Sequence, residues 1–329
     1  MQRDRAVAKV YGDFVDAATK GAMAIIEGKI IPLNPNEALR QHVYVYNEIF
    51  FSFAVDLPLS YADSTTSDSN PSYTQSNHDL QGLKILEGTN ITDLFHLATC
   101  LVNYSGHRVI CQSIIPGILN NSDLSSLAEY GTVDDKKNIV ATEAFHALML
   151  KVADALNIKV NKVIDPSDGK VVEIAGSIEV KGIRGADKRA YIVDLQGLTP
   201  RDANYIGDEY HTCLLRPELL ALYQRSRSRE YTTNKIKDFV KELEAKREPE
   251  PKPKEGEELT EEQKAQIAKA RQNEAILRIK EAERLYNEAE RFKFNTNVLK
   301  SNIKLQLSEE ELSQEIELVK SIAKFLKED

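Results

Sequence analysis

Seven basic side chains in the middle of the chain have the types and spacing that phosphate binding requires. Two of them, Arg225 and Arg229, lie four residues apart, so on a helix they would share one face and their guanidinium groups could straddle phosphates. The basic residues are Arg184, Lys188, Arg189, Arg201, Arg225, Arg227 and Arg229, and the tyrosines that could stack on unpaired bases are Tyr191, Tyr205 and Tyr210. The pattern fits RNA as a ligand. The residues alone favour the simpler interpretation, a set of solvated charges and core tyrosines.

Metal binding has weaker support, because no set of ligands is complete. The six histidines are dispersed, and His211-x-Cys213 lacks the second ligand pair that a zinc site needs. The segment that starts at Asp165 (DPSDG) begins like a calcium loop, but its closing position, which should hold a bidentate Glu, is Gly176. We therefore expect a turn at 165–169 and no metal or other cofactor.

Catalysis also lacks a complete constellation. Asn77-His78-Asp79 places a histidine beside a carboxylate, but no serine or cysteine nucleophile accompanies it in a recognised motif. Lys181 and Asp194 would face each other across a hairpin, yet the phosphate loop G-x-x-x-x-G-K-[ST] is absent from the sequence. A cross-strand salt bridge is the simpler expectation for this pair. We expect that the chain is not an enzyme.

A β-hairpin must position the basic residues Arg184, Lys188 and Arg189. Residues 178–182 and 191–195 alternate in polarity on either side of a turn that begins at Gly185. Gly185 and Asp187 tolerate positive φ, which suits a tight turn. We expect this hairpin at the centre of the core. The arginines at 225–229 would lie on a long helix that begins at Pro217.

Periodicity predicts the remaining elements. Helices are expected over 4–26, 139–156, 260–289 and 307–326, the last capped by Ser308, and a further helix after Thr89 to Asp93, through Leu101. Strands are expected within 43–55, at 80–86, at 107–115 and as a hairpin over 160–174. Tight turns between successive strands favour an α+β fold: a mostly antiparallel sheet with a central β-hairpin, packed by helices, plus a C-terminal helical extension. The predicted division is a core over 1–246, a charged Pro-rich linker over 247–258 and a C-terminal helical part over 259–329.

Composition limits where such a chain could work. The net charge of −8 over 329 residues disfavours a protein that coats nucleic acid by bulk electrostatics, although a local basic patch is compatible with it. Three cysteines in no paired spacing indicate reduced thiols inside a cell. We expect no signal peptide, and the most apolar run, 43–55, is too short to span a bilayer. We expect a cytoplasmic chain without membrane insertion.

Long segments of the sequence resemble the CLU domain of the clustered mitochondria protein family. The resemblance rests on RAVAKVYGDFVDAATKGAMAIIEGKIIPLNP (5–35), YNEIFFSFAVD (46–56), NHDLQGLK (77–84), YSGHRVICQSIIPGIL (104–119), YGTVD (130–134), VKGIRGADKRAYIVDLQGLTPRDANY (180–205) and LLRPELL (214–220), with FNTN (294–297) near the end of the domain. These segments follow the family's order over nearly the whole chain.

The resemblance implies a non-enzymatic role in the distribution of mitochondria and in binding mRNAs of nuclear-encoded mitochondrial proteins. It also implies association with translation initiation factor 3 and with the other domains of a longer chain, and it carries over no catalytic residues. A second mechanism stays open: a scaffold that docks to translation initiation factor 3 or to ribosome-associated partners. The Glu-rich stretches at 255–262 and 309–317 and the thin apolar seam of 260–289 favour that mechanism.

Overall fold

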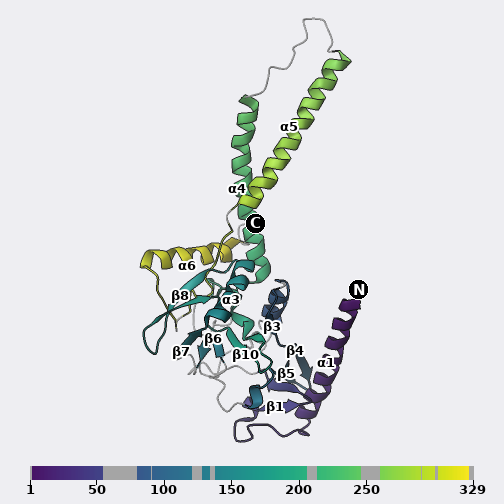
Figure 1. The fold of residues 1–329 in the computed structure, drawn as a ribbon, viewed down its shortest axis with the longest axis vertical. Coiled ribbons are helices and arrows are strands. Elements are labelled where there is room, and N and C mark those ends of the chain that lie inside the picture. Colours follow the sequence, from purple (N-terminus) through teal and green to yellow (C-terminus); the bar gives the residue numbers. More distant parts are fainter. Residues whose placement is uncertain are drawn as a thin grey trace. The chain divides into compact units, whose positions relative to one another are not determined.

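The described part of the chain forms two units that do not follow one another in the sequence. The computed structural model describes residues 2–54, 80–89, 91–120, 128–133, 138–205, 213–245, 260–289, 291–300 and 303–325. One unit comprises 1–217 together with 293–329, and the other comprises 218–292 (Figure 1). The boundaries that the sequence predicts at 246 and 259 fall inside the second unit, and the linker 247–258 lies outside the described residues, so that division stays a prediction.

The predicted α+β architecture with mostly antiparallel sheets, helices packed on them and further helices near the C-terminus is confirmed. Among the named strands only the β3–β11 pair is parallel. The largest sheet has the order β3-β11-β10-β6-β7. Its strands are β3 (Leu94–His96), β6 (Ala128–Val133), β7 (Asn138–Ala141), β10 (Lys181–Arg184) and β11 (Ala190–Val193). Strand β10 is the middle of the five, so the 181–193 hairpin is central as predicted.

Helix α3 (Glu143–Ala155) covers the central sheet and explains why a glycine lies in β10. A Cβ on Gly182 would collide with the ring of Phe145, which is fully buried. The Phe145 ring stacks on Tyr130 with 5.7 Å between the centroids. The Tyr130 hydroxyl accepts a hydrogen bond from the Ala175 amide at 2.6 Å, and burial raises the pKa of Tyr130. The core of this sheet therefore consists of the stacked rings of Tyr130 and Phe145, and Gly182 leaves the space that the Phe145 ring occupies.

A second glycine sets the path of β6. Gly131 has φ +94°, a left-handed conformation that disfavours other residues. A Cβ at this position would also collide with the carbonyl oxygen of Val180. The close approach of β6 to the segment before β10 thus depends on the missing side chain.

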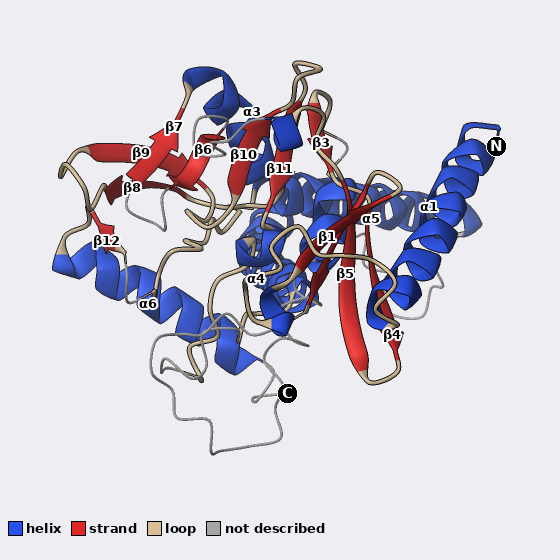
Figure 2. Ribbon diagram, turned by 90° about the horizontal axis from the view of Figure 1, so that it is seen from below, coloured by secondary structure: helices blue, strands red, loops and turns tan. Residues whose placement is uncertain are grey.

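The N-terminal sheet has the order β1-β2-β5-β4 and is covered by α1 (Gln2–Ile26). Its strands are β1 (Val43–Tyr46), β2 (Ile49–Phe53), β4 (Thr99–Tyr104) and β5 (His107–Ser113). Figure 2 shows α1 lying along β4 and β5. The C-terminal half of α1 buries Ala18, Ala22 and Ile25 against Phe51 and Cys111. Small helix residues let the sheet approach closely, and the apolar surface buried here stabilises this half of the unit.

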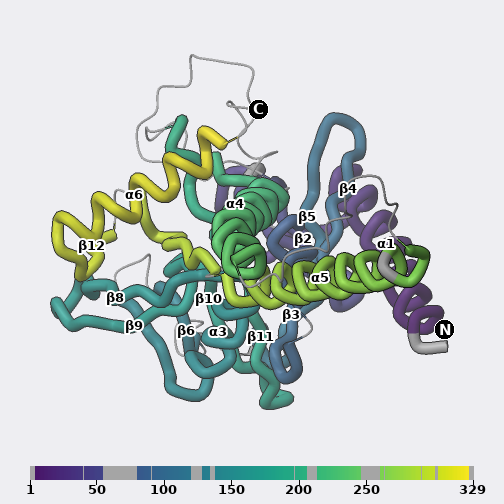
Figure 3. Tube along the Cα trace, turned by 90° about the horizontal axis from the view of Figure 1, so that it is seen from above, coloured from purple at the N-terminus to yellow at the C-terminus, as the bar shows by residue number. Residues whose placement is uncertain are grey.

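A third sheet, β12-β8-β9, joins the two chain segments of the first unit, 1–217 and 293–329. It consists of β8 (Val160–Ile164), β9 (Val171–Ala175) and β12 (Lys304–Leu305), and α6 (Glu309–Lys324) runs beside it (Figure 3). Ser308 caps α6: its hydroxyl accepts from the Glu311 amide at 3.2 Å, and the Glu311 carboxylate accepts from the Ser308 amide at 2.9 Å. The predicted cap is confirmed.

The segment 165–169 is a turn, as predicted. One carboxylate oxygen of Asp165 accepts from the amide and the hydroxyl of Ser167 at 2.8 and 2.7 Å, and the other accepts from the Ile139 amide at 2.8 Å. Burial of Asp165 opposes its ionisation, but these hydrogen bonds outweigh burial and lower the pKa of the carboxyl. An ionised aspartate therefore ties the β8–β9 turn to the start of β7.

The predictions for 80–101 are wrong. Residues 80–87 are helical instead of a strand, and the predicted helix through Leu101 is β3 followed by β4. Asp93, expected to cap a helix, takes φ +70° at the entry to β3. Strand β3 pairs in parallel with β11, with Phe95 opposite Tyr191. A strand partner almost a hundred residues away thus overrides the local helical signal.

The second unit consists mainly of two helices, α4 (Pro217–Ala245) and α5 (Glu261–Glu288). Its interior lies where α4 meets the residues after α5: Tyr223 packs against Phe292 at 5.9 Å between ring centroids, and the Phe292 amide donates to Gln224 at 2.8 Å. Within the described ranges, none of the helices has the length and apolar character needed to cross a bilayer.

Candidate nucleic-acid interface

The tip of the β10–β11 hairpin presents two of the predicted basic residues to solvent. The turn is closed by the Gly185 amide, which donates to the Arg189 carbonyl at 3.0 Å. Lys188, and not Gly185 or Asp187, takes the left-handed conformation, with φ +64°. Gly185 is needed for space instead, because a Cβ there would lie 2.6 Å from Asp187 Oδ1 and 2.9 Å from the ring of Tyr191. Both Lys188 and Arg189 are exposed.

Arg189 lies over an exposed aromatic ring. Its guanidinium carbon is 5.0 Å from the centroid of Phe95, a cation–π contact, and Phe95 in turn packs against Tyr191 at 6.0 Å. Asp187 accepts a hydrogen bond from the Tyr191 hydroxyl at 2.9 Å and lies 3.7 Å from Arg189 Nε. The side chain of Arg189 is 59% exposed. This arrangement offers a cation and an aromatic surface at one place, as single-stranded nucleic acid requires.

Arg184, the last residue of β10 before the turn, is half-buried and is held by other residues of the protein. Its guanidinium forms a bidentate ion pair with the Glu129 carboxylate, with both bonds at 2.7 Å, and donates to the Lys188 carbonyl at 3.1 Å. The hydrogen bonds to Glu129 raise the pKa of Arg184. Arg184 thus holds the hairpin to β6, and its role in RNA binding stays a prediction that this geometry does not favour.

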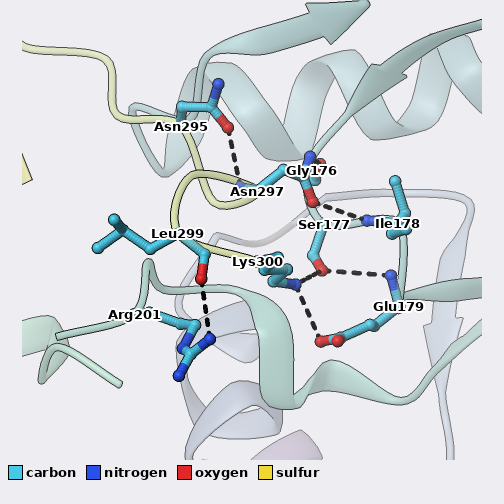
Figure 4. Close-up of polar contacts among 9 residues, drawn as sticks. All are labelled: Gly176, Ser177, Ile178, Glu179, Arg201, Asn295, Asn297, Leu299 and Lys300. Atoms are coloured by element: carbon cyan, nitrogen blue, oxygen red, sulfur yellow. Dashed lines mark hydrogen bonds and ion pairs between the residues drawn. The ribbon is translucent and has the colours of Figure 1, made fainter. Parts of the chain in front are cut away.

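Arg201 lies in a buried polar cluster formed by the 176–179 segment and the 295–300 segment (Figure 4). Arg201 is only 8% exposed, and its guanidinium donates to the Leu299 carbonyl at 2.8 Å. Asn297, also buried, donates to the Gly176 carbonyl at 2.8 Å and accepts from the Ile178 amide at 3.2 Å. The Arg201 guanidinium therefore connects its own segment to the 295–300 segment and has little exposed surface with which to bind a phosphate.

The same cluster contains a lysine beside a serine, an arrangement that acyl-transfer enzymes use. Lys300 Nζ lies 2.7 Å from Ser177 Oγ and 2.9 Å from a Glu179 carboxylate oxygen. Ser177 is fully buried, and its hydroxyl also accepts from the Glu179 amide at 3.2 Å. These contacts fasten the 295–300 segment to the residues just before β10.

The three arginines of α4 lie in the second unit. Arg225 and Arg229 are exposed on one helix face, and within the described part of the chain neither makes an ion pair. Arg227 is more engaged: its guanidinium lies 5.5 Å from the Phe292 centroid and donates to Glu230 at 2.8 Å. Arg225 and Arg229 therefore share one helix face, as the sequence predicts, and have no internal partner among the residues that the structure describes.

Four of the seven candidate basic residues fall into two exposed sets, one in each unit. Lys188 and Arg189 share the hairpin tip, and Arg225 and Arg229 share a face of α4; their RNA binding stays a prediction. Of the tyrosines, Tyr191 is buried behind Phe95, Tyr205 is 49% exposed and Tyr210 lies outside the described residues.

Sequence reasoning missed Phe95 and Glu129. Phe95 fell in a segment predicted to be helical, and nothing in the sequence paired Glu129 with an arginine 55 residues further on. The salt bridge expected between Lys181 and Asp194 is present at 3.0 Å. Within the described ranges, no group of three or more His, Cys, Asp and Glu side chains is placed to hold a metal ion.

Comparison with known proteins identifies the family of the chain. A family model described as "CLU: Clustered mitochondria" matches residues 1–205, more than half of the sequence. The chain belongs to the clustered mitochondria family. The resemblance seen in the sequence motifs is thereby confirmed.

Relatives in this family carry names that refer to mitochondria or to the protein clueless. The chain is 35% identical over 346 aligned positions to the clustered mitochondria protein homolog of Dictyostelium discoideum, covering 99% of this chain and 25% of the relative. It is 39% identical over 271 positions to the clustered mitochondria protein of Arabidopsis thaliana, with 71% and 19% covered. Protein clueless of Drosophila willistoni is 33% identical over 245 positions, with 69% and 17% covered. The matches span about a quarter or less of each of these relatives. No solved structure matches the chain.

The clustered mitochondria family model ends before the fold of this member does. Residues 293–325 complete the first unit: β12 pairs with β8, Phe294 forms an isolated bridge with Ile158, and the 295–300 segment closes the buried polar cluster. The family match at 1–205 therefore covers a part of the first unit that depends on residues about ninety positions further along the chain.

Proposed function

We propose that this chain is a non-enzymatic cytoplasmic module that acts in the organisation of mitochondria and binds mRNAs of nuclear-encoded mitochondrial proteins. The names of its relatives support the first part. The observation that carries the second part is the Arg225–Arg229 pair on α4, because these guanidinium groups are exposed and have no internal partner in the described residues.

The spacing of this pair suits a charged backbone. Residues four apart on an α-helix are about 6 Å apart along its axis, so two flexible side chains on one face can reach neighbouring phosphates. Exposed arginines contribute to binding by releasing condensed cations from the RNA, and this contribution weakens as salt rises. A chain with net charge −8 can bind RNA in this way only through local basic surfaces.

RNA binding can be measured by fluorescence anisotropy with the 329-residue chain and a labelled single-stranded RNA over a series of salt concentrations. Arg225→Glu with Arg229→Glu should weaken binding at least tenfold. If two phosphate contacts are lost, the slope of log affinity against log salt should become shallower by about 1.4.

The matched control is Lys237→Glu with Lys241→Glu. These two exposed lysines lie on the same helix with the same spacing, and their reversal changes the net charge by the same amount. Equal losses in the two double variants would show that total charge, and not the Arg225–Arg229 pair, determines affinity. Unchanged affinity and slope in the arginine variant would remove α4 from the proposal.

A scaffold that docks to translation initiation factor 3 or to ribosome-associated partners is the second candidate. Ile276, Leu277 and Ile279 on α5 are 43%, 50% and 60% exposed, and such a group of apolar side chains is a common feature of binding surfaces. Ile276→Glu with Ile279→Glu should abolish co-purification with initiation factor 3, while Arg225→Glu with Arg229→Glu should leave it intact. Retention of the factor by the isoleucine variant would contradict docking through α5.

A further inference from the structure

Two of the three cysteines face each other across neighbouring strands. Cys100 in β4 is directly opposite Cys111 in β5, and both are free thiols. A two-residue turn joins the strands: Ser105 and Gly106 take φ +47° and +77°, the left-handed values of a type I′ hairpin. Such a turn fixes the register, so the opposition of the two sulfurs is built into the hairpin.

The distance between the strands at this pair suits a disulfide with some strain. In a two-residue hairpin the pair next to the turn, Tyr104 and His107, is hydrogen-bonded, and alternation makes Cys100–Cys111 a hydrogen-bonded pair as well. The Cα atoms of such pairs are about 5.5 Å apart, within the range of disulfides. Their Cβ atoms are about 5 Å apart, whereas a relaxed disulfide needs about 3.8 Å. Strain of this kind makes a disulfide easier to reduce.

The two thiols differ in exposure and in acidity. Cys100 is half-buried on β4, which is an edge strand, while Cys111 is fully buried beneath α1. The Cys111 thiol donates to the Val109 carbonyl at 3.9 Å. The contact between the two sulfurs lowers the pKa of Cys100 and raises the pKa of Cys111, and burial raises the pKa of Cys111 further. Cys100 is therefore the more accessible and more nucleophilic thiol, with a second thiol in contact.

We propose that Cys100 and Cys111 form a reversible intramolecular disulfide when the protein meets a two-electron oxidant such as hydrogen peroxide. Cys100 loses its proton, and the thiolate attacks one peroxide oxygen as the O–O bond breaks. The departing hydroxide takes up the proton that Cys100 released and becomes water. The resulting sulfenic acid is attacked by the Cys111 sulfur. The S–S bond forms, the S–O bond breaks, and a second water carries away the Cys111 proton. Two thiols are oxidised by two electrons and one peroxide is reduced to two waters.

Cys213 provides an internal control. It is also half-buried, but burial raises its pKa, and the described residues place no other thiol beside it. Under the same oxidant, Cys213 should stay reduced or be modified singly, and Cys213→Ser should leave the disulfide intact.

The test is thiol mapping of the folded 329-residue chain. After peroxide treatment and alkylation under denaturing conditions, two of the three thiols should be unreactive. A non-reducing tryptic digest should link the peptide of Cys100 to that of Cys111, since cleavage after Arg108 separates them, and dithiothreitol should restore both thiols. Cys100→Ser should abolish the link.

Three outcomes would overturn the proposal: both cysteines remain alkylatable after oxidation, the cross-link involves Cys213 or a second chain, or reduction fails to release it. Cys111→Ala adds a second test of the pairing. If that variant does not fold, the peptide map of the unmodified chain and of Cys100→Ser decides the question without it.

Discussion

Lys300 offers a direct test of whether residues 293–300 are part of the first unit. Its side chain is 6% exposed, and Nζ contacts Ser177 Oγ at 2.7 Å and Glu179 at 2.9 Å. Lys300→Met keeps the length of the side chain and removes the charge. The substitution leaves Glu179 without this cation and Ser177 without this donor, in a place where water has little access.

Lys300→Met is expected to lower the free energy of unfolding by about 3 kcal/mol. Removing one partner of a buried ion pair typically costs about 3–5 kcal/mol. Glu179 is 29% exposed and recovers part of its hydration, so the lower end of that range applies. In a unit of this size, 1 kcal/mol shifts the melting temperature by about 2–4 °C. Lys300→Met should therefore lower it by about 6–12 °C.

Thermal and urea unfolding, followed by near-ultraviolet circular dichroism of the tyrosines, reports on the first unit through buried Tyr130. Lys293→Met is the matched control, because this lysine is in the same segment but pairs with Asp154 in solvent at 3.3 Å. Lys293→Met should change the free energy of unfolding by no more than about 0.5 kcal/mol. In a double variant with Glu179→Gln, part of the Lys300→Met loss should be recovered.

Equal effects of Lys300→Met and Lys293→Met would refute the reasoning. That result would mean either that the 295–300 segment is not fastened to the first unit or that its contacts contribute nothing beyond those of an exposed pair. A large loss for Lys300→Met that Glu179→Gln does not relieve would assign the stabilisation to Ser177.

Three further substitutions test the packing and the acid behaviour of the first unit. Gly131→Ala should lower the free energy of unfolding by about 3 kcal/mol or more, because the strain of a positive φ and the clash with Val180 both destabilise the variant. Gly169 also has a positive φ but open space around it, so Gly169→Ala should lower the free energy of unfolding by only about 1 kcal/mol in the same urea titration. The lowered pKa of Asp165 stabilises the fold above about pH 4, and this stabilisation is lost as the pH falls through the folded-state pKa. Asp165→Asn should therefore flatten the acid side of a plot of melting temperature against pH. An unchanged plot would contradict the ionised role of Asp165. Ser308→Ala should remove about 1 kcal/mol by uncapping α6, and Ser308→Thr should restore most of it.

Elements with strong local signals could be predicted from the sequence. The apolar stripe of α1, the proline that starts α4 and the Ser308 capping box each act within a few residues. The 160–174 and 181–193 hairpins followed from tight turns between alternating strands. Strand β3 could not be found in this way, since its pairing with β11 is non-local and the capping residues before it suggested a helix.

The candidate interface shows the same limit at the level of single side chains. Arg184, Arg189 and Arg201 look alike in the sequence, yet the side chains of Arg184 and Arg189 are 35% and 59% exposed, whereas Arg201 is only 8% exposed. Their difference depends on Glu129 and Leu299, which lie 55 and 98 residues away from the arginines they hold. Local patterns can identify a basic surface, but they cannot separate its exposed members from those that brace the core.

The division of the first unit into 1–217 and 293–329 also has a consequence for its synthesis. Strand β8 leaves the ribosome long before β12, its edge partner, and α6 follows later still. About a hundred residues separate the end of the first segment from the end of α6, which is about 5–20 s of elongation. During that interval the nascent chain displays an unpaired β8 edge and an uncovered core, surfaces that chaperones bind. The helices α4 and α5 can form in the meantime, because their contacts are mostly local. Completion of the larger unit is thus timed by translation of the smaller one.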